Sequence, residues 1–194
     1  MRIGFDIDGV LADFNSSFIE DAVRVTGRDL FPPRPFDIPC WDYPQHYGYT
    51  EQETDLIWSR IVENPHWWLS LDPYEGTRDV LERLTLLDFK GHDIYFITSR
   101  PGKEAKHQTE MWLRHHGFQT RPTVLISSAK GLCAEALNLG RYVDDRDLNV
   151  VDVRNQRAWK TDVYLVDRPW NRTAMTNISG ITRVTSPLEV IATV

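Results

Sequence analysis

Two kinds of hydrophobic periodicity alternate along the second half of the chain. Short apolar runs bounded by polar residues predict buried strands over residues 93–98, 123–126, 141–144 and 162–166. Between these runs, apolar positions at helical spacing predict helices over residues 104–116, 129–138 and 148–157. Because strands that alternate with helices form parallel sheets, the pattern predicts an α/β fold with a mainly parallel sheet covered on both faces.

The first part of the chain follows a different pattern. Residues 2–8 predict a short strand that ends in acids, and apolar spacing predicts helices over residues 13–25, over 50–64 and after Pro73. Thr50 and Glu53 have the spacing of a capping box at the start of the second helix. Residues 31–39 contain repeated prolines, which exclude a helix or a central strand there because proline lacks a backbone donor. This break in the alternation predicts an insertion after the first strand.

Composition and charge exclude several classes of protein. With 194 residues, 41% of them hydrophobic and 26% charged, the chain can bury a core and is not a disordered protein. Its 22 Lys and Arg against 28 Asp and Glu give a formal net charge of −6, which argues against a stable nucleic-acid partner because phosphate neutralisation needs a cationic face. A small phosphorylated substrate remains compatible with this charge.

Cysteine usage and the apolar runs bear on the compartment. Cys40 and Cys133 are isolated, so the sequence supports neither a disulfide framework nor a zinc knuckle. The N-terminal segment has no apolar signal core, and no apolar run approaches the length of a membrane span. We therefore expect a reduced, cytoplasmic protein with no membrane partner.

Chemically active side chains gather where four predicted strands end. In chain order they are Asp6 and Asp8, then Thr98, Ser99 and Arg100, then Lys130, and finally Asp144 and Asp145. Ligands of open parallel sheets bind beyond the carboxyl ends of the strands, so these residues are predicted to converge on one site.

The charges of these residues suggest a division of roles. Asp6 and Asp144 would repel each other unless a cation lay between them, and Mg²⁺ prefers such hard oxygen ligands. A carboxylate held in this way can attack phosphorus, and Asp8, two residues on, can transfer protons to and from the reacting oxygens. Thr98 and Lys130 would bind the phosphoryl oxygens and offset their charge.

Each residue also has a plain structural interpretation. Asp8 with Gly9 is a common turn pair, and Asp144 with its acidic neighbours can form a solvated loop. Thr98 can cap the following helix, and Lys130 can be an exposed helix lysine. Their joint placement at strand ends favours the catalytic interpretation.

The order and spacing of these motifs resemble the haloacid dehalogenase (HAD) superfamily of phosphatases. The resemblance rests on the segment from Asp6 to Phe14, on Thr98, on Lys130 and on the pair Asp144-Asp145. It implies that Asp6 is the nucleophile and Asp8 the acid and base. It also implies that the Asp6 carboxylate, the Asp8 backbone carbonyl and Asp144 bind Mg²⁺, and that Asp145 supports the site through Lys130.

Within this superfamily the sequence is similar to the 5'(3')-deoxyribonucleotidases and their bacterial and phage relatives. The likeness rests on residues 8–18, 68–76 and 97–99. It implies a Rossmann-like core, residues 1–14 and 76–194, with a small helical cap inserted over residues 15–75. It also implies Mg²⁺-dependent hydrolysis of nucleoside monophosphates, preferably deoxypyrimidine ones, and a possible homodimer. The sequence departs from the animal enzymes at Arg100, where they carry proline, and Arg100 is assigned a supporting role.

Aromatic residues are concentrated in the inserted region. Twelve of the 22 Phe, Tyr and Trp residues lie between Phe14 and Tyr74. We expect most of one group to fill a small core: Phe18, Phe31, Phe36, Trp58 and Tyr74. The candidates for stacking on a nucleobase are Phe14, Trp41, Tyr43, Trp67 and Trp68.

Three functions stay open from the sequence. The first is a phosphatase for nucleoside monophosphates, and the second is a phosphatase for another small phosphoester, such as a sugar phosphate or a nucleic-acid 3'-phosphate. The third is a non-catalytic phosphate-binding module, which the presence of Asp6 argues against because binding alone needs no nucleophile. A segment after the last predicted strand, residues 168–172, either orients a loop near the site or is a surface loop anchored by Trp170.

Overall fold

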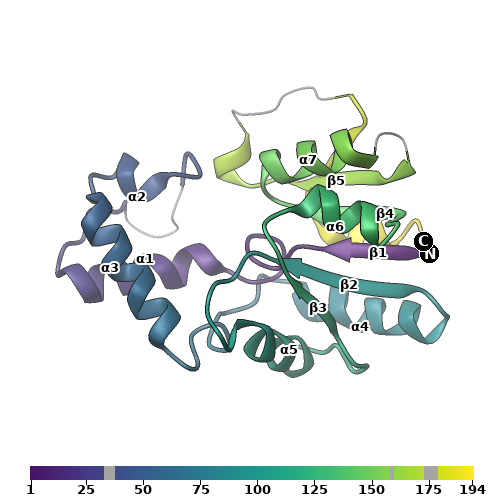
Figure 1. Cartoon of the computed structure of the whole chain (residues 1–194), viewed down its shortest axis with the longest axis horizontal. Helices are drawn as coiled ribbons and strands as arrows, with labels where there is room; N and C mark the ends of the chain where they lie inside the picture. The colour runs from purple at the N-terminus through teal and green to yellow at the C-terminus, as the bar shows by residue number, and fades with distance from the viewer. Residues whose placement is uncertain (33–37, 158–159, 173–178) are drawn as a thin grey trace.

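The computed structural model describes residues 1–32, 38–157, 160–172 and 179–194, and its strands form one parallel sheet (Figure 1). The strand order is β3-β2-β1-β4-β5-β6, and every neighbouring pair is parallel. The strands are β1 (Arg2–Phe5), β2 (Asp93–Thr98), β3 (Thr123–Ile126), β4 (Arg141–Asp144), β5 (Asp162–Val166) and β6 (Ile181–Val184). The predicted α/β fold with a parallel sheet is confirmed.

Helices cover both faces of this sheet. They are α4 (Thr77–Phe89), α5 (Ala105–His115), α6 (Lys130–Ala136), α7 (Asp147–Arg157) and α8 (Pro187–Ile191). Successive strand residues point to opposite faces, so Tyr142 and Val143 of β4 belong to different hydrophobic clusters. The cluster around Val143 includes residues of α4 and α5, and the cluster around Tyr142 includes residues of α6 and α7. The sheet is thus the middle layer of three.

The hydrophobic pattern does not predict β6 or α8. Strand β6 lies at one edge of the sheet, and only Val184 among its residues is buried. Such a strand lacks the continuous apolar run by which the central strands are recognised. Helix α8 has only five residues, too few for a helical period to stand out.

Three helices lie beyond the carboxyl end of β1, at the opposite end of the molecule from the two termini (Figure 1). They are α1 (Phe14–Thr26), α2 (Tyr43–His46) and α3 (Glu51–Glu63). Asp13 caps α1 by accepting a hydrogen bond from the Ser16 N–H, and the predicted capping box of Thr50 and Glu53 opens α3. These helices follow β1 in the chain and stand over the edge of the sheet where ligands of parallel sheets bind.

Part of the proline-rich segment, including Phe36, lies outside the described residues. Within the described residues, no helix has both the length and the apolar composition that a membrane span requires.

Candidate active site

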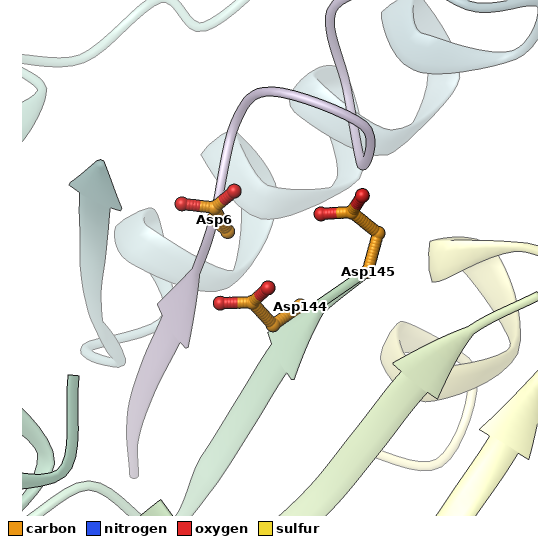
Figure 2. A group of neighbouring side chains, drawn as sticks. All are labelled: Asp6, Asp144 and Asp145. Carbon is orange, nitrogen blue, oxygen red and sulfur yellow. The ribbon is translucent and has the colours of Figure 1, made fainter. Parts of the chain in front are cut away.

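Three buried aspartates meet at the ends of the two central strands (Figure 2). Asp6 follows β1 directly, Asp144 ends β4, and Asp145 comes next in the chain. The Asp6 N–H donates to the Val143 carbonyl at 2.8 Å, which continues the pairing of β1 with β4 and places the side chains together. Each aspartate offers a carboxylate oxygen, and these oxygens all lie within 4.8 Å of one another.

Burial and mutual repulsion make these carboxylates hard to ionise. Burial, with smaller contributions from Asp144 and Asp8, raises the pKa of Asp6 to about 7, although Lys130 opposes the rise. Burial also raises the pKa of Asp144 and of Asp145. The cluster therefore needs a positive charge to be fully ionised at neutral pH.

Lys130 supplies one such charge. It is the first residue of α6, and its ammonium group donates to Asp6 Oδ1 at 2.7 Å and to the Ile97 carbonyl. Burial by itself would lower the pKa of Lys130, but the neighbouring Asp6 and Asp144 outweigh it and the pKa is raised. Lys130 is thus a buried, charged group aimed at Asp6.

Asp144 and Asp145, at the end of β4, differ in their hydrogen bonds. The Asp144 carboxylate accepts from the Tyr142 hydroxyl at 2.5 Å, from the Arg146 N–H at 2.8 Å and from Asn149 Nδ2 at 3.0 Å. Asp145 Oδ2 accepts from Trp170 Nε1 at 2.8 Å, whereas the buried Asp145 Oδ1 has no hydrogen-bond partner among the described residues. The expectation that Asp145 acts through Lys130 is therefore wrong, since its partner is Trp170.

A divalent cation fits this donor set. Three crowded carboxylates and one orphaned, buried oxygen are what a hard cation with oxygen ligands requires. The Asp6, Asp144 and Asp145 carboxylates would hold it, so the structure adds Asp145 to the ligands expected from the sequence. Participation of the Asp8 backbone carbonyl stays a prediction.

We expect Mg²⁺ affinity to weaken as the pH falls below about 7. The raised pKa means that the folded protein keeps a proton on Asp6 up to this pH, and that proton must leave before the carboxylate binds a cation. If cation binding displaces one proton, the apparent Kd for Mg²⁺ should rise about tenfold for each unit by which the pH falls between about 7 and 5. Titration calorimetry in non-chelating buffers checks this. A Kd that stays constant over that range would contradict it, and the Asp6→Asn variant should show a flatter dependence.

The loop after β1 is built to lie against the aspartates. Gly9 has a φ of 80°, and a Cβ at this position would lie 2.1 Å from Asp145 Oδ2. Arg168 Nε donates to the Gly9 carbonyl at 2.6 Å. Together with the hydrogen bond from Trp170 to Asp145, this places residues 168–172 against the site, as the first of the two sequence interpretations holds.

Thr98, Ser99 and Arg100 line one cavity of about 260 Å³ with Asp6 and Asp8. Thr98 Oγ1 lies 3.3 Å from Asp8 Oδ2, and Ser99 Oγ donates to the Ser127 carbonyl at 3.2 Å. Lys130 is not among the residues that line this cavity, and its ammonium group donates to Asp6. The strand ends therefore bring Thr98, Ser99, Asp6 and Asp8 into one cavity, whereas Lys130 is connected to it through Asp6.

Aromatic rings also line the cavity. They come from Phe14, Phe18, Trp41, Tyr43, Trp58 and Trp68. Phe14 lies at the centre, with its ring centroid 5.7 Å from that of Trp58 and 6.1 Å from that of Trp68, both nearly parallel. Four of the five stacking candidates thus line the cavity.

One of the aromatic predictions needs correction, and another is incomplete. Trp67, a stacking candidate, lies outside the cavity lining: it packs edge-on against Phe14 and its Nε1 donates to Asp21. Phe18 belongs to the buried core as expected and Trp58 packs against it, but both also line the cavity. Helical spacing alone does not separate a ring that faces a core from one that faces a cavity beside it.

Arg146, which the sequence pattern does not single out, also lines the cavity. Its guanidinium group lies 4.8 Å from the centre of the Trp41 ring, and its Nε is buried without a hydrogen-bond partner among the described residues. Arg146 directly follows Asp144 and Asp145 in the sequence, and this position could have indicated that it lies near the site. Arg146 therefore connects the end of β4 with the segment before α2.

A comparison with protein families assigns the chain. The family model described as "5' nucleotidase, deoxy (Pyrimidine), cytosolic type C protein" (NT5C) matches residues 1–193. The chain belongs to this family. Its members are nucleotidases, so the predicted class of phosphoric monoester hydrolase is confirmed.

Two curated proteins are similar to the chain, and each is described as a candidate nucleotidase. The protein of Bacillus cereus is 29% identical over 122 residues, which are 61% of this chain and 60% of that protein. The chain thus spans less than two thirds of that relative. The protein of Oceanobacillus iheyensis is 26% identical over 176 residues, 89% of each chain.

Solved structures show the same fold. A candidate haloacid dehalogenase-like hydrolase of Burkholderia xenovorans has a TM-score of 0.61 at 14% identity, with 98% of this chain and 94% of that chain covered. A candidate HAD hydrolase of Bacillus subtilis, bound to magnesium, has a TM-score of 0.56 at 12% identity, with 99% and 97% covered. At these identities the likeness is one of fold alone.

Proposed function

We propose that the protein is a Mg²⁺-dependent phosphatase that hydrolyses nucleoside monophosphates, preferably deoxypyrimidine ones, through an aspartyl-phosphate on Asp6. The observation that carries the proposal is the pairing of two unlike regions in one cavity. One region consists of Asp6, Asp8 and Thr98 at the strand ends, and the other consists of the aromatic rings around Phe14. A phosphate fits the first region and a nucleobase the second.

The chain's own residues supply both halves of the reaction. An Asp6 carboxylate oxygen attacks phosphorus, the bond from phosphorus to the leaving oxygen breaks, and Asp8 gives that oxygen a proton. Asp8 then takes a proton from a water molecule whose oxygen attacks phosphorus. The bond from phosphorus to Asp6 breaks, which releases inorganic phosphate and restores the Asp6 carboxylate. Lys130 orients Asp6 by engaging its Oδ1.

Charge is the second requirement of this reaction. A bound divalent cation would neutralise charge on the phosphoryl oxygens and on the three carboxylates. Thr98, the last residue of β2, and Ser99, the next residue, both line the cavity and carry hydroxyl groups. These hydroxyl groups would hold the phosphoryl group.

Phosphate release from a substrate panel tests the proposal. The panel contains 5'- and 3'-deoxynucleotides and ribonucleotides of each base, ribose 5-phosphate and p-nitrophenyl phosphate, each with and without Mg²⁺. We expect the highest kcat/KM for deoxypyrimidine nucleotides with Mg²⁺. Faster turnover of sugar phosphates than of every nucleotide would overturn the substrate assignment and leave the chemistry intact, and turnover of no substrate would leave a phosphate-binding module.

The Phe14→Ala variant extends this test to the base. Stacking on an aromatic side chain is worth about 1–3 kcal/mol per base, so the KM for nucleotides should rise at least about fivefold. The KM for ribose 5-phosphate, which has no base, should change little. Phe89→Ala is the matched control, because Phe89 is 72% exposed on α4. An equal rise in KM for both substrates would show that Phe14 does not stack on the base.

A further inference from the structure

Arg100 is a large buried cation beside the site, and the proposed reaction gives it no role. It lies two residues beyond the end of β2, and its side chain is 0% exposed. A buried guanidinium is costly unless its donors are satisfied. Here Nε and Nη2 donate to Asp8 Oδ2 and Oδ1 at 2.9 and 2.7 Å, and Nη1 donates to Thr109 Oγ1 at 2.9 Å.

The guanidinium group is also held by a tryptophan ring. The ring of Trp68 lies 4.9 Å from its central carbon, close enough for a cation–π contact. Trp68 is fixed in turn, because its Nε1 donates to the Pro101 carbonyl at 3.1 Å and its backbone N–H donates to Gln108 Oε1 at 2.9 Å. Arg100 therefore has little freedom to turn.

We propose that Arg100 is a positioning residue that orients the Asp8 carboxyl group for proton transfer to the leaving oxygen. This inference rests on the role given to Asp8 in the proposed function. A fork-to-fork pair fixes the plane of a carboxyl group as well as its place, which a single hydrogen bond does not. The Asp8 side chain stays 17% exposed toward the cavity, so a carboxyl group aimed in this way remains within reach of a substrate.

The test compares leaving groups in Arg100 variants. A deoxynucleotide leaves as an alkoxide and needs a proton from Asp8, whereas p-nitrophenolate leaves readily without one. The quantity measured is kcat/KM, which reports formation of the phosphoenzyme and is independent of its later hydrolysis. For Arg100→Gln we expect kcat/KM to fall about 100-fold for the nucleotide, mainly through kcat, and less than about fivefold for p-nitrophenyl phosphate. Arg100→Lys, which keeps the charge and loses the fork, should lie between.

Three further arms separate the inference from its assumptions. Asp8→Asn should lose nucleotide turnover, and if it does not, the proposed role of Asp8 fails. Adding Arg100→Gln to Asp8→Asn should cost nothing more, since the arginine would act only through Asp8. Arg78→Gln is the matched control, because Arg78 lies exposed on α4.

Two outcomes overturn the positioning role while the proposed function stands. One is an equal loss for both substrates, which points to a structural role for Arg100, and a fall in thermal unfolding midpoint would accompany it. The other is faster nucleotide turnover in the variants, which would mean that the arginine restrains Asp8.

Discussion

Asp6→Asn is expected to reduce nucleotide turnover at least about 10⁴-fold, because the amide cannot form the acyl phosphate. Asp6 is buried between Lys130 and Asp144, and its burial removes the competing water that would otherwise solvate the carboxylate. Phosphate release under saturating substrate and Mg²⁺ measures the loss. Asp93→Asn is the matched control, since Asp93 begins β2 at the far end of the sheet and is exposed.

The intermediate itself can be trapped. Acid quenching of the wild-type protein during turnover of a nucleotide labelled in its phosphate should leave the label on the peptide that contains Asp6. The label should be released by hydroxylamine, which cleaves acyl phosphates, and should be missing in Asp6→Asn. Full activity of the variant, or a label on another residue, would contradict the assignment of the nucleophile.

Lys130→Met is expected to lose both activity and stability. The ammonium group is buried with Asp6 Oδ1 at 2.7 Å, and its removal takes away the positive charge that offsets Asp6 and Asp144. Breaking a buried pair by removing one partner costs about 3–5 kcal/mol, and the repulsion among the carboxylates acts in the same direction. We expect a clearly lower midpoint of thermal unfolding in EDTA and a fall of at least about 100-fold in kcat.

The thermal unfolding of Lys130→Met should also depend on Mg²⁺. A cation that offsets the same charges should recover part of the lost stability, so the midpoint of Lys130→Met should rise more on Mg²⁺ addition than that of the wild type. Lys106→Met is the matched control, because Lys106 forms an exposed pair with Glu110 on α5. A variant as stable as the wild type in EDTA would show that Lys130 does not offset the aspartates.

Much of the fold follows from local pattern. The central strands are continuous apolar runs and the helices between them have one apolar face, so the α/β class and five of the six strands can be predicted. Edge strand β6 is not predicted because few of its side chains are buried, and α2 and α8 are not predicted because they are short.

For the site, the sequence predicts which residues lie together but not which hydrogen bonds they form. The rule that parallel strands present their carboxyl ends at one edge places Asp6 beside Asp144 without any coordinates. It does not tell which partner each side chain chooses. Asp145 pairs with Trp170, 25 residues away, where the resemblance pointed to Lys130, and Trp58 enters the cavity in place of Trp67.

By itself the sequence determined the parallel α/β fold, the order of the chemical groups at its strand ends and the family to which the chain belongs. These depend on short-range periodicity and on residue identity, which can be read directly from the sequence. Only the tertiary structure decided that one Asp145 oxygen has no hydrogen-bond partner among the described residues, that Arg146 faces Trp41 and that the guanidinium group of Arg100 holds Asp8. Such contacts join segments far apart in the chain, and packing and the desolvation of charge select them.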